Sequence, residues 1–350
     1  MRIAQLVSNL YSIPPKSSKA IYSLAGLLTD ELVKRGHNVS LFTTKDSQTL
    51  ANLEYVTEKA VFEIPGLGEI AKQRYMHLLA SRCYQKSEEF DIIHSHFNLL
   101  GCYYSPLVKT PTVHTIHSPI TSDMVSVLEK VKNQNFISIS WAQRKQLPAL
   151  NWVANIYHGV DTEKYVYNPE PKDYFLFLGR ITEQKGVHLA IEAARAAKVK
   201  LIIAGKSYSN EDYWHKQIEP FIDGVNIRYI GEADNNAKIE YLKNAKALIF
   251  PTHANEPFGM VMIEAMSCGT PVIGYKTAAV PEVVKDGKTG YLVKDAKGIF
   301  KAMEKIEKIN RLDCRQRAEN FFSVRKMVEG YEKVYQRVIE EEIRREFFKK

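Results

Sequence analysis

Short apolar runs rich in Val, Ile and Phe alternate along the chain with longer segments in which apolar residues recur every three or four positions. The short runs are typical of buried parallel strands and the longer segments of amphipathic helices. In the first half the pattern predicts strands near residues 2–7, 39–43, 92–95, 112–116 and 136–140. In the second half it predicts strands near residues 174–178, 200–204, 227–230, 247–250 and 271–275. We therefore expect an α/β chain built around parallel sheets.

The chain is long enough to form two domains. Its 350 residues exceed the usual size of a single domain. The two series of strands are separated by residues 165–171, a segment with Pro169, Pro171 and no periodic pattern, which is typical of a linker. We therefore expect a Rossmann-like domain at residues 1–167, a second one at residues 168–335 and a basic C-terminal helix at residues 336–350.

Composition places the chain among soluble globular proteins. Hydrophobic residues make up 45% and charged residues 25% of the sequence, which excludes collagen-like and wholly disordered chains. No segment reaches the run of about 18 apolar residues that a membrane span needs, and the first apolar run is shorter than a signal-peptide core. The four cysteines contain no C-x-x-C pair. We therefore expect a cytoplasmic protein with reduced cysteines.

The net charge of +8 would suit a nucleic acid, an anionic membrane or a phosphorylated small molecule. Residues 297–350 hold 15 Lys or Arg against 10 Asp or Glu, so +5 of the excess lies there. This segment is either a solvated charged helix face or an amphipathic helix that contacts a membrane, because Phe347 and Phe348 lie among cations. No nucleic-acid-binding motif is present, so we expect no nucleic-acid partner.

The loop at residues 179–186 carries two cations between a predicted strand and a predicted helix. In open α/β folds such a loop lies at the carboxyl edge of the sheet, where ligands bind, and the next helix directs free N–H groups toward it. Arg180 supplies a forked donor and Lys185 a mobile point charge. The two residues are either exposed loop cations or a clamp for a diphosphate.

Two carboxylates follow the predicted strand that ends at Phe250. We expect Pro257 in the first turn of a helix, which places Glu256 beside the helix N-terminus and Glu264 about two turns inside. Apolar neighbours surround Glu264 in the sequence, so its carboxylate needs partners. A ribose diol would supply two hydroxyl donors, and the alternative is a partly exposed glutamate paired with a lysine.

These segments resemble a known family. The run E-P-F-G-M-V-M-I-E-A-M-S-C-G-T-P-V-I-G at residues 256–274, followed by V-P-E-V-V-K-D-G-K-T-G-Y-L-V at residues 280–293, is similar to the signature of the retaining GT-B glycosyltransferases. That family includes bacterial mannosyltransferases, sucrose synthases and glycogen synthases. The resemblance implies two Rossmann-like domains that face each other across a cleft, with a C-terminal helix that crosses back to the first domain.

The resemblance also implies a role for each matching residue. Glu264 would bind the nucleotide ribose, Arg180 and Lys185 the diphosphate, and Glu256 the hydroxyls of the donor sugar. His117 matches the histidine that faces the transferred sugar. The implied catalytic residues are His117, Arg180, Lys185 and Glu256, and the implied donor-binding residues are Lys19, Arg180, Lys185, Glu256, Phe258, Gly259, Met260 and Glu264.

Two departures from the family pattern concern glycines. The family carries Gly-Gly in its first loop and again before the Pro-Glu of the second domain, where this chain has Lys19-Ala20 and Ala278-Ala279. Side chains there would crowd a phosphate that lies against the turn, unless Lys19 replaces amide contacts with a charge. The departures leave open a noncatalytic or weakly active nucleotide-sugar-binding relative.

The function that the sequence favours is metal-independent, retaining transfer of a hexosyl group from a nucleotide diphosphate sugar to an unidentified acceptor hydroxyl. No Asp-x-Asp sequence is present to hold a divalent cation, so we expect neither a metal nor another cofactor. UDP-glucose is the first choice of donor and GDP-mannose the second. The C-terminal helix is the candidate for a weak, peripheral membrane contact.

Three other enzyme and metal classes are considered. A glycosidase would also use two carboxylates but would leave Arg180 and Lys185 without a role. A zinc site could draw on His94-x-His96 and the histidines at residues 114 and 117, but no carboxylate or thiolate accompanies them. The G-x-G-x-x-A run at residues 66–71 matches a dinucleotide-binding motif in letters alone, since Pro65 precedes it instead of a strand.

Overall fold

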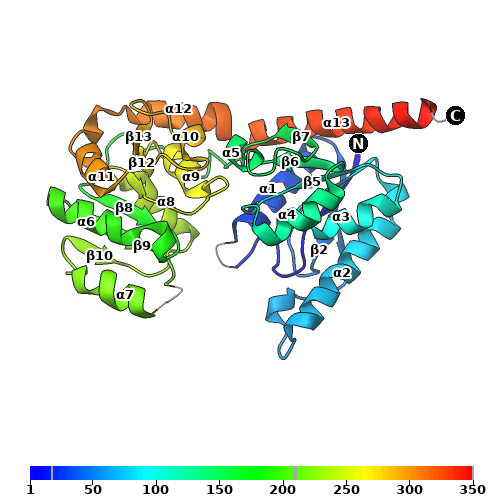
Figure 1. Cartoon of the computed structure of the whole chain (residues 1–350), viewed down its shortest axis with the longest axis horizontal. Coiled ribbons are helices and arrows are strands. Elements are labelled where there is room, and N and C mark those ends of the chain that lie inside the picture. Colours follow the sequence, from blue (N-terminus) through cyan, green and yellow to red (C-terminus); the bar gives the residue numbers. More distant parts are fainter. Residues whose placement is uncertain (17–18, 208–210, 349–350) are drawn as a thin grey trace. The chain divides into compact units, whose positions relative to one another are not determined.

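The computed structural model describes residues 1–16, 19–207 and 211–348, so Lys349 and Lys350 of the predicted basic helix lie outside the described residues. The chain divides into two compact units, shown by sequence colour in Figure 1. The first contains Met1–His158 together with the chain from Val324 onward, and the second is Gly159–Ser323.

The predicted domain boundaries are corrected at both ends of the second unit. The chain enters that unit after His158, not at residue 168, because the N–H of Val160 donates to the Phe322 carbonyl at 2.8 Å and the N–H of Asn168 to the Cys268 carbonyl at 3.1 Å. It leaves after Ser323, not at residue 335. The hydrogen bonds of the proline-containing segment thus tie it to the second unit instead of leaving it as a linker.

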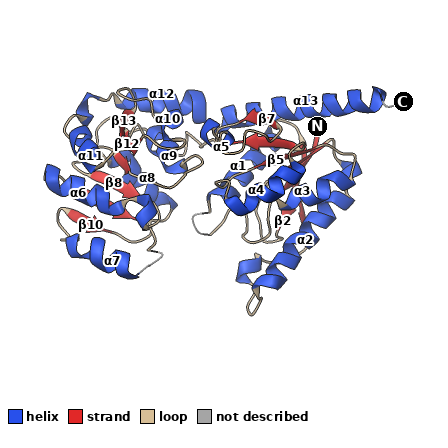
Figure 2. Ribbon diagram, in the orientation of Figure 1, coloured by secondary structure: helices blue, strands red, loops and turns tan. Residues whose placement is uncertain are grey.

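The first unit is a seven-stranded parallel sheet in the order β3-β2-β1-β4-β5-β6-β7. Strands are drawn in red and helices in blue in Figure 2. Its strands are β1 (Arg2–Leu6), β2 (Asn38–Thr43), β3 (Asn52–Tyr55), β4 (Ile92–Ser95), β5 (Thr112–Thr115), β6 (Asn135–Ser138) and β7 (Trp152–Asn155). The five predicted strands are present, and the pattern missed β3 and β7. These two edge strands contain polar residues and are only half-buried, so they lack the apolar run of a central strand.

Helices cover this sheet, and the last of them is the C-terminal helix. They are α1 (Ala20–Lys34), α2 (Glu69–Gln85), α3 (Leu100–Tyr104), α4 (Ser122–Leu128), α5 (Trp141–Arg144) and α13 (Val324–Phe348), with short 3₁₀ turns η1 (Val61–Glu63), η2 (Ser87–Glu89), η3 (Ser105–Leu107) and η4 (Glu129–Val131). Helix α13 packs against α1 and buries Tyr331 and Tyr335 completely. The prediction that the C-terminal helix returns to the first domain is confirmed, and the helix is longer than predicted.

The second unit is a six-stranded parallel sheet in the order β10-β9-β8-β11-β12-β13. Its strands are β8 (Phe175–Leu178), β9 (Leu201–Ala204), β10 (Ile227–Tyr229), β11 (Leu248–Phe250), β12 (Val272–Tyr275) and β13 (Gly290–Val293). Its helices are α6 (Val187–Ala197), α7 (Glu211–Gln217), α8 (Asn235–Asn244), α9 (Met260–Ser267), α10 (Val280–Val283), α11 (Ala296–Met303) and α12 (Arg311–Phe322), with 3₁₀ turns η5 (Glu183–Lys185), η6 (Glu219–Phe221) and η7 (Ile306–Lys308).

The strand order of each unit determines where a ligand site can form. The sequence order reverses between β1 and β4 in the first sheet and between β8 and β11 in the second. Ligands of open α/β sheets bind beyond the carboxyl ends of strands at such switch points. The predicted α/β class with two Rossmann-like domains is confirmed. None of the helices in the described part of the chain is long and apolar enough to cross a membrane.

Candidate functional site

The loop after β8 holds its two cations in different surroundings. Ile181 is buried and its N–H donates to the Lys206 carbonyl at 3.0 Å, which anchors the loop beside the end of β9. Arg180, directly before Ile181, is exposed to solvent. Lys185 lies in η5 and keeps only 14% of its side chain exposed, because its ammonium donates to Oε2 of Glu256. Lys185, which is predicted to bind the diphosphate, and Glu256, which is predicted to bind the donor sugar, are therefore in direct contact.

Gly186 brings two loops of the second unit together. Its backbone is left-handed, with φ +73°, and a Cβ there would lie 2.3 Å from the carbonyl oxygen of Pro251. A side chain is therefore excluded, and the loop after β8 packs against the loop after β11. The N–H of His253 donates to the Gln184 carbonyl at 2.9 Å, and Thr252 Oγ1 donates to the same oxygen at 3.2 Å. The two segments that carry the predicted donor site thus form one site.

Helix α9 begins later than the sequence predicts. Gly259, in the left-handed region with φ +88°, is its N-cap, so the first helical residue is Met260 and Pro257 remains in the preceding loop. Glu264 consequently lies little more than one turn inside the helix instead of two. Phe258 is fully buried and packs edge-on against Phe322, with ring centroids 5.9 Å apart. This anchor directs the free N–H groups of the first turn of α9 toward the loop that contains Glu256.

Glu264 has two hydrogen-bond donors in this structure. Its Oε1 accepts from the Tyr165 hydroxyl and from the Lys238 ammonium, each at 2.8 Å, and 12% of its side chain is exposed. Burial, and then the charge of Glu264, raises the pKa of Tyr165, so the phenol stays protonated and donates. Of the two alternatives that the sequence left open, a partly exposed glutamate paired with a lysine is the one that this structure contains. Both bonds use Oε1, and within the described part of the chain no bond to Oε2 is present.

His117 lies in the first unit, two residues beyond the end of β5. It is buried, and its Nε2 is 2.9 Å from Nδ1 of His96. The centroid of its ring lies 5.1 Å from that of His96 and 5.2 Å from that of His158, and both neighbouring rings are within 22° of its plane. Burial lowers the pKa of His117 to about 3, so the imidazole is neutral near pH 7. A neutral, oriented ring can exchange hydrogen bonds with a sugar but is a poor proton donor at that pH.

A buried polar network that the sequence analysis missed surrounds His117. It includes Gln5 of β1, His94 of β4, and Tyr331 and Tyr335 of α13. Two signals in the sequence mark it: Gln5 interrupts an otherwise apolar strand, and the two tyrosines are spaced one helical turn apart on a highly charged helix. Polar groups at such positions indicate a network, because an unpaired buried polar group is costly.

The zinc alternative finds no ligand set in the described residues, where no group of three or more His, Cys, Asp or Glu side chains is arranged to hold a metal ion. His94 instead bonds the Tyr335 hydroxyl at 2.6 Å and Thr115 at 2.7 Å, and His96 bonds Gln5 at 2.8 Å. Both ring nitrogens of each histidine are thus used by the network.

Two family models together match most of the chain. Residues 161–321 match the glycosyl transferases group 1, and residues 24–164 match glycosyltransferase family 4. The chain belongs to the group 1 glycosyltransferases. The boundary between the two matched regions falls where the second unit begins, so each Rossmann-like unit has its own counterpart in the family. The prediction of a glycosyltransferase enzyme is confirmed.

Relatives of this glycosyltransferase are similar over most of their length. An uncharacterized glycosyltransferase of Methanocaldococcus jannaschii is 28% identical over 280 residues, which cover 72% of this chain and 76% of the relative. The phosphatidyl-myo-inositol mannosyltransferase of Mycobacterium leprae is 27% identical over 320 residues, which cover 84% of this chain and 83% of the relative.

Solved structures establish that the glycosyltransferase has the GT-B fold. AviGT4, a glycosyltransferase of avilamycin A biosynthesis, superposes with a TM-score of 0.74 at 21% identity, over 97% of this chain and 98% of its own. Anabaena HepE in complex with UDP and glucose superposes with a TM-score of 0.74 at 18% identity, over 96% and 99% of the two chains. The predicted fold class is confirmed.

The residues at the family's glycine positions keep part of the glycine geometry. Ala278 has φ +44°, in the left-handed region that glycine favours, and Ala279 after it is completely buried. The turn of the second unit therefore keeps a backbone suited to glycine although the side chain has changed. In the first unit Lys19 precedes α1, with its Nζ 4.6 Å from the ring centre of Tyr11. That contact holds the cation of Lys19 at the start of α1.

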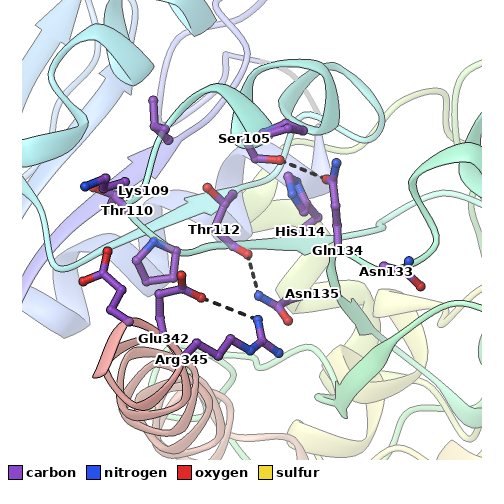
Figure 3. A pocket seen from close by; sticks show the side chains of 14 residues that line it. Ser105, Lys109, Thr110, Thr112, His114, Asn133, Gln134, Asn135, Glu342 and Arg345 are labelled. Carbon is purple, nitrogen blue, oxygen red and sulfur yellow. Dashed lines mark hydrogen bonds and ion pairs between the residues drawn. The ribbon is translucent and has the colours of Figure 1, made fainter. Parts of the chain in front are cut away.

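A separate cavity of about 660 Å³ lies in the first unit (Figure 3). Thr112 and Asn135, at the amino ends of β5 and β6, line one side, and Glu342 and Arg345 of α13 line another. Ligand sites of parallel sheets form at the carboxyl ends of strands, and His117 follows that end of β5. The cavity therefore lies at the other edge of the sheet from His117 and is not the candidate site.

Proposed function

We propose that this glycosyltransferase moves a hexosyl group, with glucose as the first choice, from a UDP-sugar to an acceptor hydroxyl, without a metal ion and with retention of configuration. The observation that carries the proposal is the site in the second unit, where Gly186 locks the loop with Arg180 and Lys185 against the loop with Glu256. The structural similarity to HepE, which was solved with UDP and with UDP-glucose, supports the choice of base and sugar.

The ion pair between Lys185 and Glu256 prepares both residues for the donor. When a diphosphate arrives, Lys185 exchanges the carboxylate for a phosphate oxygen, and exposed Arg180 supplies a second, forked contact. Glu256 is then free to accept hydrogen bonds from sugar hydroxyls. After this exchange Lys185 is paired with the phosphate and Glu256 is hydrogen-bonded by hydroxyls, so each half-buried group has a polar partner before and after binding.

We infer that Glu264 binds the ribose. Tyr165 and Lys238 fix its carboxylate through Oε1, which leaves Oε2 for a hydroxyl of the nucleoside. A carboxylate held on one oxygen loses little further freedom when a diol binds the other, so its affinity for the diol is higher. In this proposal Lys238 and Tyr165 orient the carboxylate instead of replacing the ribose.

The reaction breaks the bond between the anomeric carbon and the phosphate oxygen. The electron pair goes to the diphosphate, whose growing negative charge is stabilised by Arg180 and Lys185. The acceptor hydroxyl forms its new bond to the anomeric carbon on the same face, and its proton goes to the departing phosphate oxygen. His117 is neutral because burial lowers its pKa, so it orients a sugar hydroxyl and does not transfer that proton.

Alanine variants and a donor panel test the proposal. Lys185→Ala should lower kcat/KM by about 100-fold or more, because one preorganised contact to the developing charge is lost. Lys297→Ala, which removes an exposed lysine of α11, is the matched control and should leave the rate unchanged. The measurement is release of nucleoside diphosphate from UDP-glucose, UDP-galactose and GDP-mannose. Turnover with GDP-mannose alone would contradict the choice of donor, and equal rates for both variants would contradict the role of Lys185.

The second candidate function is binding of a nucleotide sugar without turnover, and Ala278 is the observation that favours it. Its side chain stands at a turn where the family has glycine. Calorimetric binding of UDP-glucose without any hydrolysis or transfer would favour this candidate. Turnover with any donor of the panel would exclude it.

A cytoplasmic location and a peripheral membrane contact are also part of the proposal. The last turns of α13 expose Ile343, Phe347 and Phe348 beside Arg344 and Arg345, a combination that suits the surface of an anionic membrane. The name of the mycobacterial relatives points to a lipid acceptor. Sedimentation with vesicles of anionic phospholipid at low salt is the test, and a protein that stays in the supernatant would end the membrane proposal.

A further inference from the structure

A continuous line of hydrogen bonds joins His117 to the C-terminal helix. His117 Nε2 is 2.9 Å from His96 Nδ1, and His96 Nε2 is 2.8 Å from Gln5 Oε1. The Gln5 amide donates to the Tyr335 hydroxyl at 3.1 Å, and that hydroxyl is 2.6 Å from His94 Nδ1. We call these five residues the histidine relay. All of them are buried, so water does not compete for their bonds.

The amide of Gln5 orders the protons along the relay. Because its Nε2 donates to Tyr335, its Oε1 accepts, and His96 must donate from Nε2. A neutral imidazole that donates from one nitrogen accepts at the other, so His96 Nδ1 accepts the proton of His117 Nε2. Burial lowers the pKa of His96 well below its usual range, which keeps that ring neutral. The proton of His117 therefore stands on Nε2.

The other ring nitrogen of His117, Nδ1, has no hydrogen bond within the described part of the chain. Its Nδ1 is buried and without a hydrogen-bond partner, whereas both polar atoms of Gln5, both ring nitrogens of His94 and of His96, and the Tyr335 hydroxyl are all bonded. A buried acceptor that the fold leaves unpaired is costly unless a ligand supplies the donor. Every other polar side-chain atom of the relay is therefore hydrogen-bonded, and the lone pair on His117 Nδ1 is left for a ligand.

The orientation of that lone pair is also fixed. The planes of the His96 and His158 rings each lie at 22° to the plane of His117, with centroids 5.1 and 5.2 Å away. His96 meets His117 edge to edge, and the bond from Nε2 to His96 Nδ1 opposes a turn of the His117 ring that would exchange its two nitrogens. A sugar hydroxyl that reaches Nδ1 therefore meets an acceptor of fixed direction, which is the requirement for a contact that orients a substrate.

We propose that Gln5, His96 and Tyr335 are positioning residues that hold His117 in the tautomer protonated on Nε2, so that Nδ1 accepts a hydrogen bond from a hydroxyl of the transferred sugar. The inference rests on the proposed function for the identity of the ligand. The tautomer itself is a property of the protein without ligand. The C-terminal helix thereby acts on the site through Tyr335.

Nitrogen NMR measures the tautomer directly. Long-range ¹H–¹⁵N correlation spectra of protein labelled with ¹⁵N-histidine distinguish the protonated nitrogen of each ring, and the His117→Ala variant assigns the signals of His117. We expect Nε2 to be protonated and Nδ1 unprotonated between about pH 6 and pH 8, because His117 remains neutral there. A proton on Nδ1 would overturn the proposal, whatever the enzyme transfers.

A titration with two ligands tests what the lone pair binds. UDP-glucose should shift the Nδ1 resonance of His117, whereas UDP, which lacks the sugar, should not. Calorimetry on the same samples separates two failures. If UDP-glucose binds and the Nδ1 resonance does not move, the proposed contact is wrong while the donor is right. If neither UDP-glucose nor GDP-mannose binds, the proposed function fails and the tautomer result is judged alone.

Two tyrosines of α13 provide a matched pair of variants. Tyr335→Phe removes the hydroxyl that accepts from Gln5, whereas Tyr331→Phe removes a buried hydroxyl that bonds Thr115 Oγ1 at 3.2 Å. Tyr335→Phe should populate a second tautomer of His117 and lower kcat by about 10-fold, a size usual for a residue that orients a ligand-binding group. Tyr331→Phe should change both less, because the Tyr331 hydroxyl reaches the relay only through Thr115 and His94. Equal effects of the two variants would overturn the role of Tyr335.

Variants of His96 complete the test. His96→Asn keeps an acceptor near the position of Nδ1 and should preserve much of kcat, whereas His96→Leu removes it and should lower kcat by about 10-fold to 100-fold. The tautomer of His117 should be retained in the first variant and lost in the second. If His96→Leu folds, as judged by its circular dichroism spectrum, and retains both the tautomer and the rate, the proposal is wrong.

Discussion

Single residues of the donor site are paired with one another in the absence of a donor. Lys185 bonds Glu256, and Lys238 bonds Glu264 at 2.8 Å. A half-buried charge needs an opposite charge nearby. Here Lys185 and Glu256, both of which the proposed function assigns to the donor, neutralise each other, and Lys238 neutralises Glu264. The sequence left two alternatives open for Glu264, and the pairing with Lys238 is the one present in this structure, while ribose binding belongs to the proposed function.

Ala278 shows at the residue scale how a side chain can conflict with its backbone. With φ +44° it occupies the left-handed region, which costs an L-residue about 1–2 kcal/mol. Ala278→Gly removes that cost, although glycine adds about 0.4–1 kcal/mol of unfolded-state entropy. We therefore expect the free energy of unfolding to rise by about 0.5–1 kcal/mol, measured by urea denaturation.

A matched alanine variant controls this prediction. Ala279→Gly, at the buried neighbour with an ordinary negative φ, should lower the free energy of unfolding, because it adds entropy to the unfolded chain without relieving strain. A loss of stability in both variants would show that the turn does not strain Ala278.

The role of helix α13 depends on its packing against the first unit, to which the chain returns at Val324. Besides the relay it carries Glu332, which bonds Arg35 Nη1 and His37 Nε2, each at 2.9 Å. These partners lie at the end of α1 and the start of β2. The helix is therefore fixed to the first unit by a charge cluster at its middle as well as by buried tyrosines.

Removing the Glu332 carboxylate should loosen α13. Glu332→Ala leaves the partly buried Arg35 with only its longer contact to Glu31, at 3.5 Å, and removes the partner of His37 Nε2, so it should lower the free energy of unfolding by about 1–3 kcal/mol. The control on the same helix is Glu341→Ala, whose carboxylate is 46% exposed and lies 3.9 Å from Arg337, and it should change stability by less than about 0.5 kcal/mol. Urea denaturation compares the two, and equal losses would contradict the assigned cluster.

The elements also show which parts of the fold the sequence reveals. Central strands such as β9 and β11 are completely buried and consist of apolar residues, so their positions were predicted closely. The edge strand β7 was missed because its apolar run is only three residues long, between Asn151 and Asn155. The start of α9 was misplaced because the pattern at Pro257 suggests a first turn, whereas the left-handed Gly259 starts the helix later.

At the scale of the whole molecule, five buried histidines couple stability to pH. Burial lowers the pKa of His114 and of His117 to about 3, and holds the pKa of His94, His96 and His158 well below the usual range. Below about pH 6.5 the unfolded chain binds protons at these residues that the folded chain does not bind. Above that pH the histidines are neutral in both states and their burial costs no protonation free energy. Below that pH their burial lowers the free energy of unfolding.

We expect the free energy of unfolding to fall as pH drops from about 6.5 toward about 3, by up to about 1.4 kcal/mol per pH unit for each buried histidine. Urea denaturation followed by circular dichroism at a series of pH values measures the slope. His114→Asn removes one of the five buried histidines and should reduce the slope by the contribution of that residue. A free energy of unfolding that stays constant over this range would contradict the neutral burial of the cluster.

The sequence by itself determined the α/β class, the central strands, the family resemblance and the loops that carry Arg180, Lys185, Glu256 and Glu264. These features are encoded locally, because periodicity identifies buried faces and short motifs stay contiguous along the chain.

Only the tertiary structure decided which of these residues are partners. Gln5 and Tyr335 are separated by 330 positions, and their bond depends on α13 returning to the first unit. The pairing of Lys185 with Glu256 depends on the missing side chain of Gly186, which lets two loops touch. A hydrogen bond requires two groups within about 3 Å of each other, and where distant segments of a chain meet is determined by the packing of the whole fold.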